Sequence, residues 1–130
     1  MYKINIIIPS IRIDSRLIRC LSGIQKLNYK NFFVTLILEN KKNIYQLKKF
    51  KLIIKTLVTK KMNMSEKRNF AAKKFNSDFL AFIDSDACPD KNWLSNALKT
   101  LKSRKIGIIG GPNIPFKNET FWQKISYYCK

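Results

Sequence analysis

Hydrophobic runs of strand length alternate with segments of helical spacing along this chain. The runs cover residues 4–8, 32–38, 52–58, 79–83 and 106–109. The first run is interrupted only by Asn5, which is typical of a strand buried on both faces. In the segment that follows it, apolar side chains recur every three or four residues, at Ile13, Leu17, Leu21, Ile24 and Leu27. This alternation predicts an α/β fold of three layers, in which helices cover both faces of a mainly parallel sheet.

Polar residues and a proline mark where the helices should begin. We expect helices over residues 13–27, 43–50, 66–76 and 89–101. Asp14 or Ser15 can cap the first of them, and Ser65 can cap the third. Pro89 suits the first turn of the last helix, and we expect Trp93 to anchor that helix in the core.

The loops that follow the strands are where a ligand is expected to bind. In a parallel sheet the ligand lies beyond the carboxyl ends of the strands, in the crevice where the strand order reverses. These loops begin at Pro9-Ser10, Glu39-Asn40, Thr59, Asp84-Ser85-Asp86 and Gly110-Gly111. The glycine patterns of a Rossmann dinucleotide site and of a P-loop do not occur in the sequence. The sequence therefore predicts a crevice site of another kind.

The length of the chain allows one domain with its own core. Of its 130 residues, 45% are hydrophobic, and a second core would not fit. No apolar run reaches the ~18 residues of a membrane-spanning helix, and the apolar start meets Pro9 without a cleavage site. We therefore expect a cytoplasmic protein. Cys20, Cys88 and Cys129 form no metal-binding pattern in a chain without histidine, and we expect isolated, reduced thiols.

The charge balance is strongly basic. The chain has 26 basic and 8 acidic residues and a formal net charge of +18, which favours nucleic acid, an anionic membrane face or phosphorylated substrates as partners. The lysines are spread along the whole sequence, as on solvated helix faces. No nucleic-acid motif occurs, and the aromatic residues fall mainly in predicted core elements. A basic nucleic-acid-binding module therefore remains an alternative hypothesis, and nucleic acid is not the expected partner.

Asp84 and Asp86 follow the fourth hydrophobic run with one residue between them. Two carboxylates at the mouth of a crevice repel each other unless a cation compensates them. Mg²⁺ or Mn²⁺ takes one or two carboxylates together with substrate phosphates, and it stabilises the charge on a departing diphosphate. Because the same triplet is also common as a turn or a helix cap, the metal-site hypothesis depends on its context.

That context is a set of motifs spread over nearly the entire chain. The segment Lys67-Arg68-Asn69-Phe70-Ala71 precedes the strand and the Asp84-Ser85-Asp86 triplet, and Trp93-Leu94 follows them. An opening strand that ends in Ile8-Pro9-Ser10 and the run at 106–113 agree with the same order of elements. This combination resembles the family 2 glycosyltransferases. The resemblance implies a GT-A fold, which is a Rossmann-like fold, with residues 1–130 as the donor-binding half of one such domain.

For the metal and the diphosphate, the resemblance implies roles for five residues. Asp86 would ligate Mn²⁺ or Mg²⁺, and Asp84 would lie near the ribose and the metal-bound water, with Ser85 between them. Arg68 matches the arginine that helps to hold the nucleotide, and Asn69 matches the residue that follows it. A guanidinium suits this place, because its planar fork matches phosphate oxygens and its charge is permanent.

For the nucleoside, the resemblance implies contacts at Pro9, Ser10 and Glu39. Glu39 stands where the family usually has an aspartate that contacts the base, and it is one methylene longer. The implied donor is a UDP- or GDP-sugar, and the implied activity is metal-assisted transfer of a hexose-like sugar in cell envelope polysaccharide biosynthesis. A saccharide, a lipid-linked sugar or a protein would be the acceptor.

The general base that activates the acceptor hydroxyl is not visible in the sequence. After Asp86 the only acidic residues are Asp90, which reads as a helix cap, and Glu119, which lies in a polar turn. We therefore expect that the acceptor half is largely missing. The alternative is a catalytically incomplete GT-A domain that only binds nucleotide. The basic, aromatic segment 121–130 is compatible with a helix at the inner face of a membrane.

Overall fold

Two compact units, residues 1–98 and 99–130, divide the chain. The computed structural model describes residues 1–104, 106–112 and 114. The first unit contains all four strands of the sheet. Every residue that the sequence predicts for the site therefore belongs to this unit.

The four strands form one parallel sheet in the order β3-β2-β1-β4. Their bounds are β1 (Ile4–Pro9), β2 (Phe32–Leu38), β3 (Ile54–Val58) and β4 (Phe79–Phe82). The strand order reverses beside β1, because β2 and β3 lie on one side of it and β4 lies on the other. This arrangement confirms the predicted α/β fold, and by the rule for such sheets a ligand is expected at the carboxyl end of β1.

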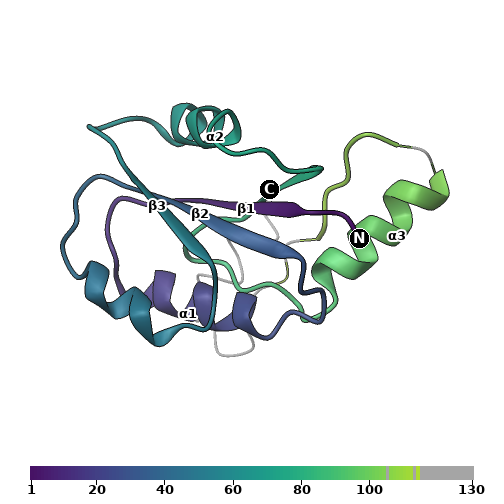
Figure 1. Ribbon diagram of the computed structural model, residues 1–130, viewed down its shortest axis with the longest axis horizontal. Coiled ribbons are helices and arrows are strands. Elements are labelled where there is room, and N and C mark those ends of the chain that lie inside the picture. The colour runs from purple at the N-terminus through teal and green to yellow at the C-terminus, as the bar shows by residue number, and fades with distance from the viewer. Residues whose placement is uncertain (105, 113, 115–130) are drawn as a thin grey trace. The chain divides into compact units, whose positions relative to one another are not determined.

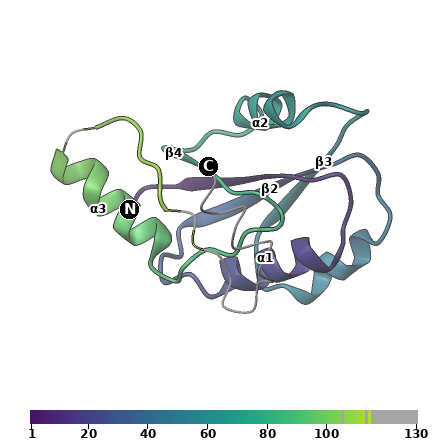
Figure 2. The ribbon, with the colours of Figure 1, turned by 180° about the vertical axis from the view of Figure 1, so that it is seen from behind.

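Helices lie on both faces of this sheet. Their bounds are α1 (Ser15–Gln25), α2 (Met64–Ala72) and α3 (Trp93–Arg104), with a 3₁₀ helix, η1, over Ile44–Lys49. Figures 1 and 2 show α1 and α2 on opposite faces of the sheet. Among the described residues, no helix is long and apolar enough to cross a membrane.

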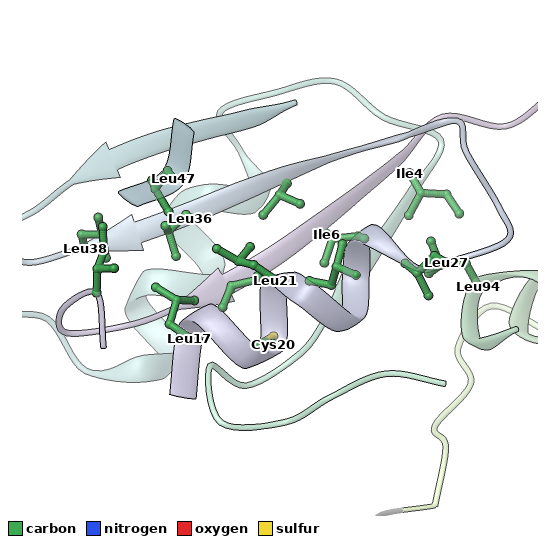
Figure 3. Packing of buried hydrophobic residues seen from close by; sticks show 14 of the residues in the cluster. Ile4, Ile6, Leu17, Cys20, Leu21, Leu27, Leu36, Leu38, Leu47 and Leu94 are labelled. Atoms are coloured by element: carbon green, nitrogen blue, oxygen red, sulfur yellow. The ribbon is translucent and has the colours of Figure 1, made fainter. Parts of the chain in front are cut away.

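The larger core fills the space between α1 and the sheet (Figure 3). Leu17 and Leu21 of α1 meet Ile6 and Leu36 of the central strands, and all four side chains are fully buried. Burial of such a side chain contributes about 1.5–3 kcal/mol. Trp93 packs against the same core, so its predicted role as a core anchor is confirmed.

Helix caps fix where α1 and α2 begin. The Asp14 carboxylate accepts hydrogen bonds from two backbone N–H groups of the first turn of α1, each at 3.1 Å, and is the cap that this helix uses. For α2 the predicted cap, Ser65, is wrong. Asn63 caps the helix, and Asn63 and Glu66 bond reciprocally to each other's backbone N–H groups at 2.9 Å. This capping box satisfies two donors, whereas a serine cap would satisfy one.

The opposite face of the sheet is covered by α2 through a small residue. Ala71 is fully buried against Ile7 of β1 and Ile37 of β2. A side chain of one carbon lets the helix backbone approach the sheet closely, as the paired alanines in the sequence indicate. The helix ends at Ala72, earlier than the predicted end near residue 76.

Two features of the strands differ from the hydrophobic pattern of the sequence. The run 79–83 is apolar throughout, yet Leu80 and Phe82 on one face of β4 are 43% and 46% exposed, because β4 lies at the edge of the described sheet. The predicted fifth strand at 106–109 is absent from the described part of the second unit. Ile108 is 89% exposed there. The segment therefore pairs with no described strand and buries little apolar surface. The glycines at and just after this run add to the entropic cost of ordering it as a strand.

Candidate functional site

The carboxyl ends of three parallel strands bring predicted site residues to one edge of the sheet. Pro9 ends β1 and Ser10 follows it, Glu39 follows β2, and Asp84 lies two residues beyond β4. Backbone hydrogen bonds extend the pairing past the strand ends, from Ser10 N to the Ile37 carbonyl at 2.9 Å and from Glu39 N to the Ile11 carbonyl at 3.1 Å. The loops after β1 and β2 are therefore held side by side.

A residue that was not predicted for the site, Lys67, joins these two loops. Its Nζ donates to the backbone oxygen of Ser10 at 2.9 Å and to Oε1 of Glu39 at 2.8 Å. The Lys67 side chain is fully buried, and that of Glu39 is 22% exposed. A signal for Lys67 was present in the sequence, because Lys67 precedes Ala71 by four positions and so shares its sheet-facing side of the helix.

Arg68, the next residue of α2, points to the loop after β4. Its Nη2 donates to Oδ1 of Asp84 at 2.5 Å, and the side chains of Arg68 and Asp84 are 32% and 64% exposed. An ion pair this exposed contributes only about 0–1 kcal/mol to stability. The contact therefore places the guanidinium beside the Asp84-Ser85-Asp86 triplet without fixing it firmly.

The loop of the triplet is seated on α1. The thiol of Cys20 donates to the Asp84 carbonyl at 3.7 Å, and Nη2 of Arg19 donates to the Asp86 carbonyl at 3.2 Å. Gly23 lets the loop approach the helix, because a Cβ at this position would lie 2.5 Å from Sγ of Cys88. Backbone oxygens of the triplet thus face α1, which leaves the Asp84 and Asp86 carboxylates exposed.

The remaining predicted residues make fewer contacts. Asn69 is exposed, and within the described residues its side chain has no hydrogen bond. Ser85 is half-buried, also without one in that part of the chain. Asp90 was predicted as a helix cap, but it lies three residues before α3 and stabilises the turn that leads into it, since its Oδ1 accepts from the backbone N–H of Asn92 at 2.8 Å. Glu119 and Cys129 lie outside the described residues, and Cys20 and Cys88 are free thiols, as expected.

The carboxylate oxygens of the triplet suit a hard divalent cation whose remaining coordination positions are filled by a bound ligand. Among the described residues no group of three or more histidine, cysteine or acidic side chains comes together. Asp84 and Asp86 offer at most two carboxylates, both exposed, and Mg²⁺ or Mn²⁺ held in this way takes its other ligands from phosphates and water. A cage made only of protein groups, as in structural zinc sites, is not formed by these residues.

The solved structures similar to this chain include TarS and a mannosyltransferase. TarS of S. aureus (residues 1–349) matches with a TM-score of 0.66 and 19% identity, over 88% of this chain and 38% of that chain. The mannosyltransferase PcManGT from Pyrobaculum calidifontis, solved in complex with GDP-Man and Mn²⁺, matches with a TM-score of 0.68 and 17% identity, over 77% and 32%. TarS has also been solved in complex with UDP-GlcNAc. The chain thus spans less than two fifths of these chains.

The family comparison covers almost the whole sequence. No curated protein matches the chain. The parallel sheet with flanking helices is that of the GT-A fold, of which the described residues form a part. The family model described as "Glycosyl transferase family 2" matches residues 5–128, and the chain therefore belongs to the family 2 glycosyl transferases.

Proposed function

We propose that this chain is the donor-binding half of a metal-assisted glycosyltransferase that uses a nucleoside diphosphate sugar. The observation that carries the proposal is the convergence of Ser10, Glu39, Arg68 and Asp84 at the carboxyl edge of the sheet in a member of this family. The similar structures in complex with GDP-Man and Mn²⁺ and with UDP-GlcNAc support it by analogy.

In this proposal the nucleoside lies against the loops after β1 and β2. Pro9 and Ser10 line one side, and the Glu39 carboxylate accepts a hydrogen bond from an N–H group of the base. Both loops are held together by backbone hydrogen bonds and by Lys67. The base is therefore met by groups whose positions are set before binding.

The diphosphate lies toward the loop after β4. Asp86 and Asp84 would hold Mn²⁺ or Mg²⁺, which would neutralise the charge that develops on the departing diphosphate. Arg68 supplies a second positive group, whose partner in the nucleotide-free protein is the Asp84 carboxylate. Phosphate oxygens offer the guanidinium a bidentate partner that competes with this exposed contact. Asn69 and Ser85 lie beside these groups in the sequence and are proposed as minor contacts.

Calorimetric titration with UDP, GDP and CMP, with and without Mn²⁺, tests this proposal. We expect UDP or GDP to bind in the presence of Mn²⁺, and Asp86→Asn to weaken that binding at least tenfold through loss of a charged ligand. Asp90→Asn is the matched control, because it removes the same charge from the same region and keeps an oxygen for the Asn92 N–H group. Nucleotide binding that ignores both Mn²⁺ and Asp86 would contradict the donor site.

The catalytically incomplete alternative predicts a different second result. Within the described residues beyond Asp86, Asp90 is the only carboxylate, and it accepts a hydrogen bond from the backbone N–H of Asn92 in the turn before α3. A chain that only binds nucleotide should bind UDP with Mn²⁺ but release no sugar from UDP-glucose or UDP-N-acetylglucosamine during prolonged incubation. Slow release of free sugar that Asp86→Asn abolishes would instead support a competent donor half.

A further inference from the structure

Lys67 carries a positive charge into the interior where α2 meets the ends of β1 and β2. Its side chain is fully buried, and its protein acceptors are the Ser10 carbonyl and one oxygen of Glu39. Removal of an ammonium group from water is costly, and an apolar residue at such a position is often as stabilising or more so. Stability alone therefore gives a weak reason for lysine at this position.

The ammonium changes what the Glu39 carboxylate can do. A glutamate side chain has several rotatable bonds, and its freedom costs free energy when a ligand fixes it. The bond to Lys67 at 2.8 Å holds Oε1 in place, while the side chain stays 22% exposed. Glu39 therefore presents a carboxylate that is already oriented and already neutralised in charge.

The same ammonium holds the neighbouring loop. Its bond to the Ser10 carbonyl at 2.9 Å joins the end of β1 to the end of β2 through one side chain of α2. The Ser10 hydroxyl is used locally, since it donates to the Arg12 carbonyl at 2.9 Å. The two sides of the proposed nucleoside site thus share one support, which lies below the surface and cannot itself reach a base.

We propose that Lys67 is a positioning residue for the nucleoside, which acts through Glu39 and leaves binding of the diphosphate unchanged. The inference rests on the proposed donor site and adds to it a means of discriminating between bases. The ligand class that suits the oriented carboxylate is a base with a ring N–H group, such as uracil or guanine. In cytosine and adenine the ring nitrogen on the pairing edge is an acceptor and would meet the carboxylate lone pair to lone pair.

The experiment separates the nucleoside from the diphosphate. UDP, GDP and inorganic pyrophosphate are titrated in Mn²⁺ into the full-length wild-type protein and its Lys67→Met, Glu39→Gln and doubly substituted variants. We expect Lys67→Met to weaken UDP or GDP binding about tenfold or more and to leave pyrophosphate affinity unchanged. In the Glu39→Gln background the same substitution should have little further effect, because the two residues act as one unit.

Lys73→Met is the matched control, since it removes an equal charge from an exposed residue at the end of the same helix. If Lys67→Met weakens UDP and pyrophosphate equally, or no more than Lys73→Met does, the inference is wrong and the donor site stands. If the wild-type protein binds neither UDP nor GDP in Mn²⁺, the proposed function itself fails. Should Lys67→Met not fold, Lys67→Gln decides, because its amide can still partner the buried polar groups but carries no charge, and it must still weaken UDP while pyrophosphate affinity stays unchanged.

Discussion

At the scale of single residues, the Cys20 thiol contacts the loop of the Asp84-Ser85-Asp86 triplet from α1. It is fully buried in α1 and donates to the Asp84 carbonyl. Burial raises the pKa of Cys20 from 9.0 to about 12, and the nearby Cys88, Asp86 and Asp84 add to this shift. A thiolate at this place would be desolvated and would lie among other negative groups. The folded protein therefore holds Cys20 as a neutral thiol.

This raised pKa predicts a loss of stability in alkaline solution. Below pH 9 the thiol is neutral in the folded and the unfolded protein; between pH 9 and 12 only the unfolded chain ionises, so the free energy of unfolding falls as the pH rises. Chemical unfolding at pH 8 to 11 should show a steeper decline for the wild type than for Cys20→Ala, which lacks this titration. Parallel curves for the two proteins would contradict the assignment.

Polar residues at the strand ends were easier to predict from the sequence than the buried lysine behind them. The rule that ligands bind at strand ends nominates Ser10, Glu39 and Asp84, and the structure brings these three residues to the carboxyl ends of neighbouring strands, because their placement depends only on strand direction. The buried contact of Lys67 with these loops is not among the predictions, because lysines are usually solvated and the chain has many of them. Its spacing from Ala71 places it on the same face of α2, but which face of that helix lies on the sheet depends on tertiary packing.

At the scale of elements, the start of α2 sets the positions of Lys67 and Arg68. The cap was assigned to Ser65, although the spacing of Asn63 and Glu66 is that of a capping box. The boundaries of strands were predicted better, because near-continuous apolar runs leave little choice of register. The predicted fifth strand at 106–109 was wrong, since an apolar run becomes a strand only where a neighbouring strand pairs with it.

Two substitutions distinguish the caps. Asn63→Ala should lower the free energy of unfolding by about 0.5–2 kcal/mol, since it leaves the backbone N–H of Glu66 without its side-chain partner. Ser65→Ala, at the exposed position that the sequence first suggested, should change it by less than about 0.5 kcal/mol. Urea denaturation of both variants checks the pair. Equal losses, or a larger loss for Ser65→Ala, would contradict the capping box.

At the scale of the whole molecule, the charge of +18 is the dominant feature. Like charges on a compact surface repel one another, and added salt screens that repulsion. We expect the midpoint of thermal unfolding to rise between low ionic strength and 0.5 M sodium chloride. Sodium sulfate at equal ionic strength is a useful comparison, because sulfate also strengthens burial of apolar surface. A midpoint that falls in sodium chloride would mean that attractive ion pairs outweigh the repulsion.

The position of β1 at the centre of the sheet has a consequence for synthesis on the ribosome. Of the four strands of this sheet, β1 is the first to emerge, yet it pairs on one side with β4. Beside these paired strands, the hydrogen bond from Lys3 N to Asp78 spans 75 residues. At about 5–20 residues per second, the nascent chain must wait several seconds before β4 leaves the exit tunnel. During that interval one edge of β1 is open, so chaperones that bind apolar nascent segments should engage this strand first.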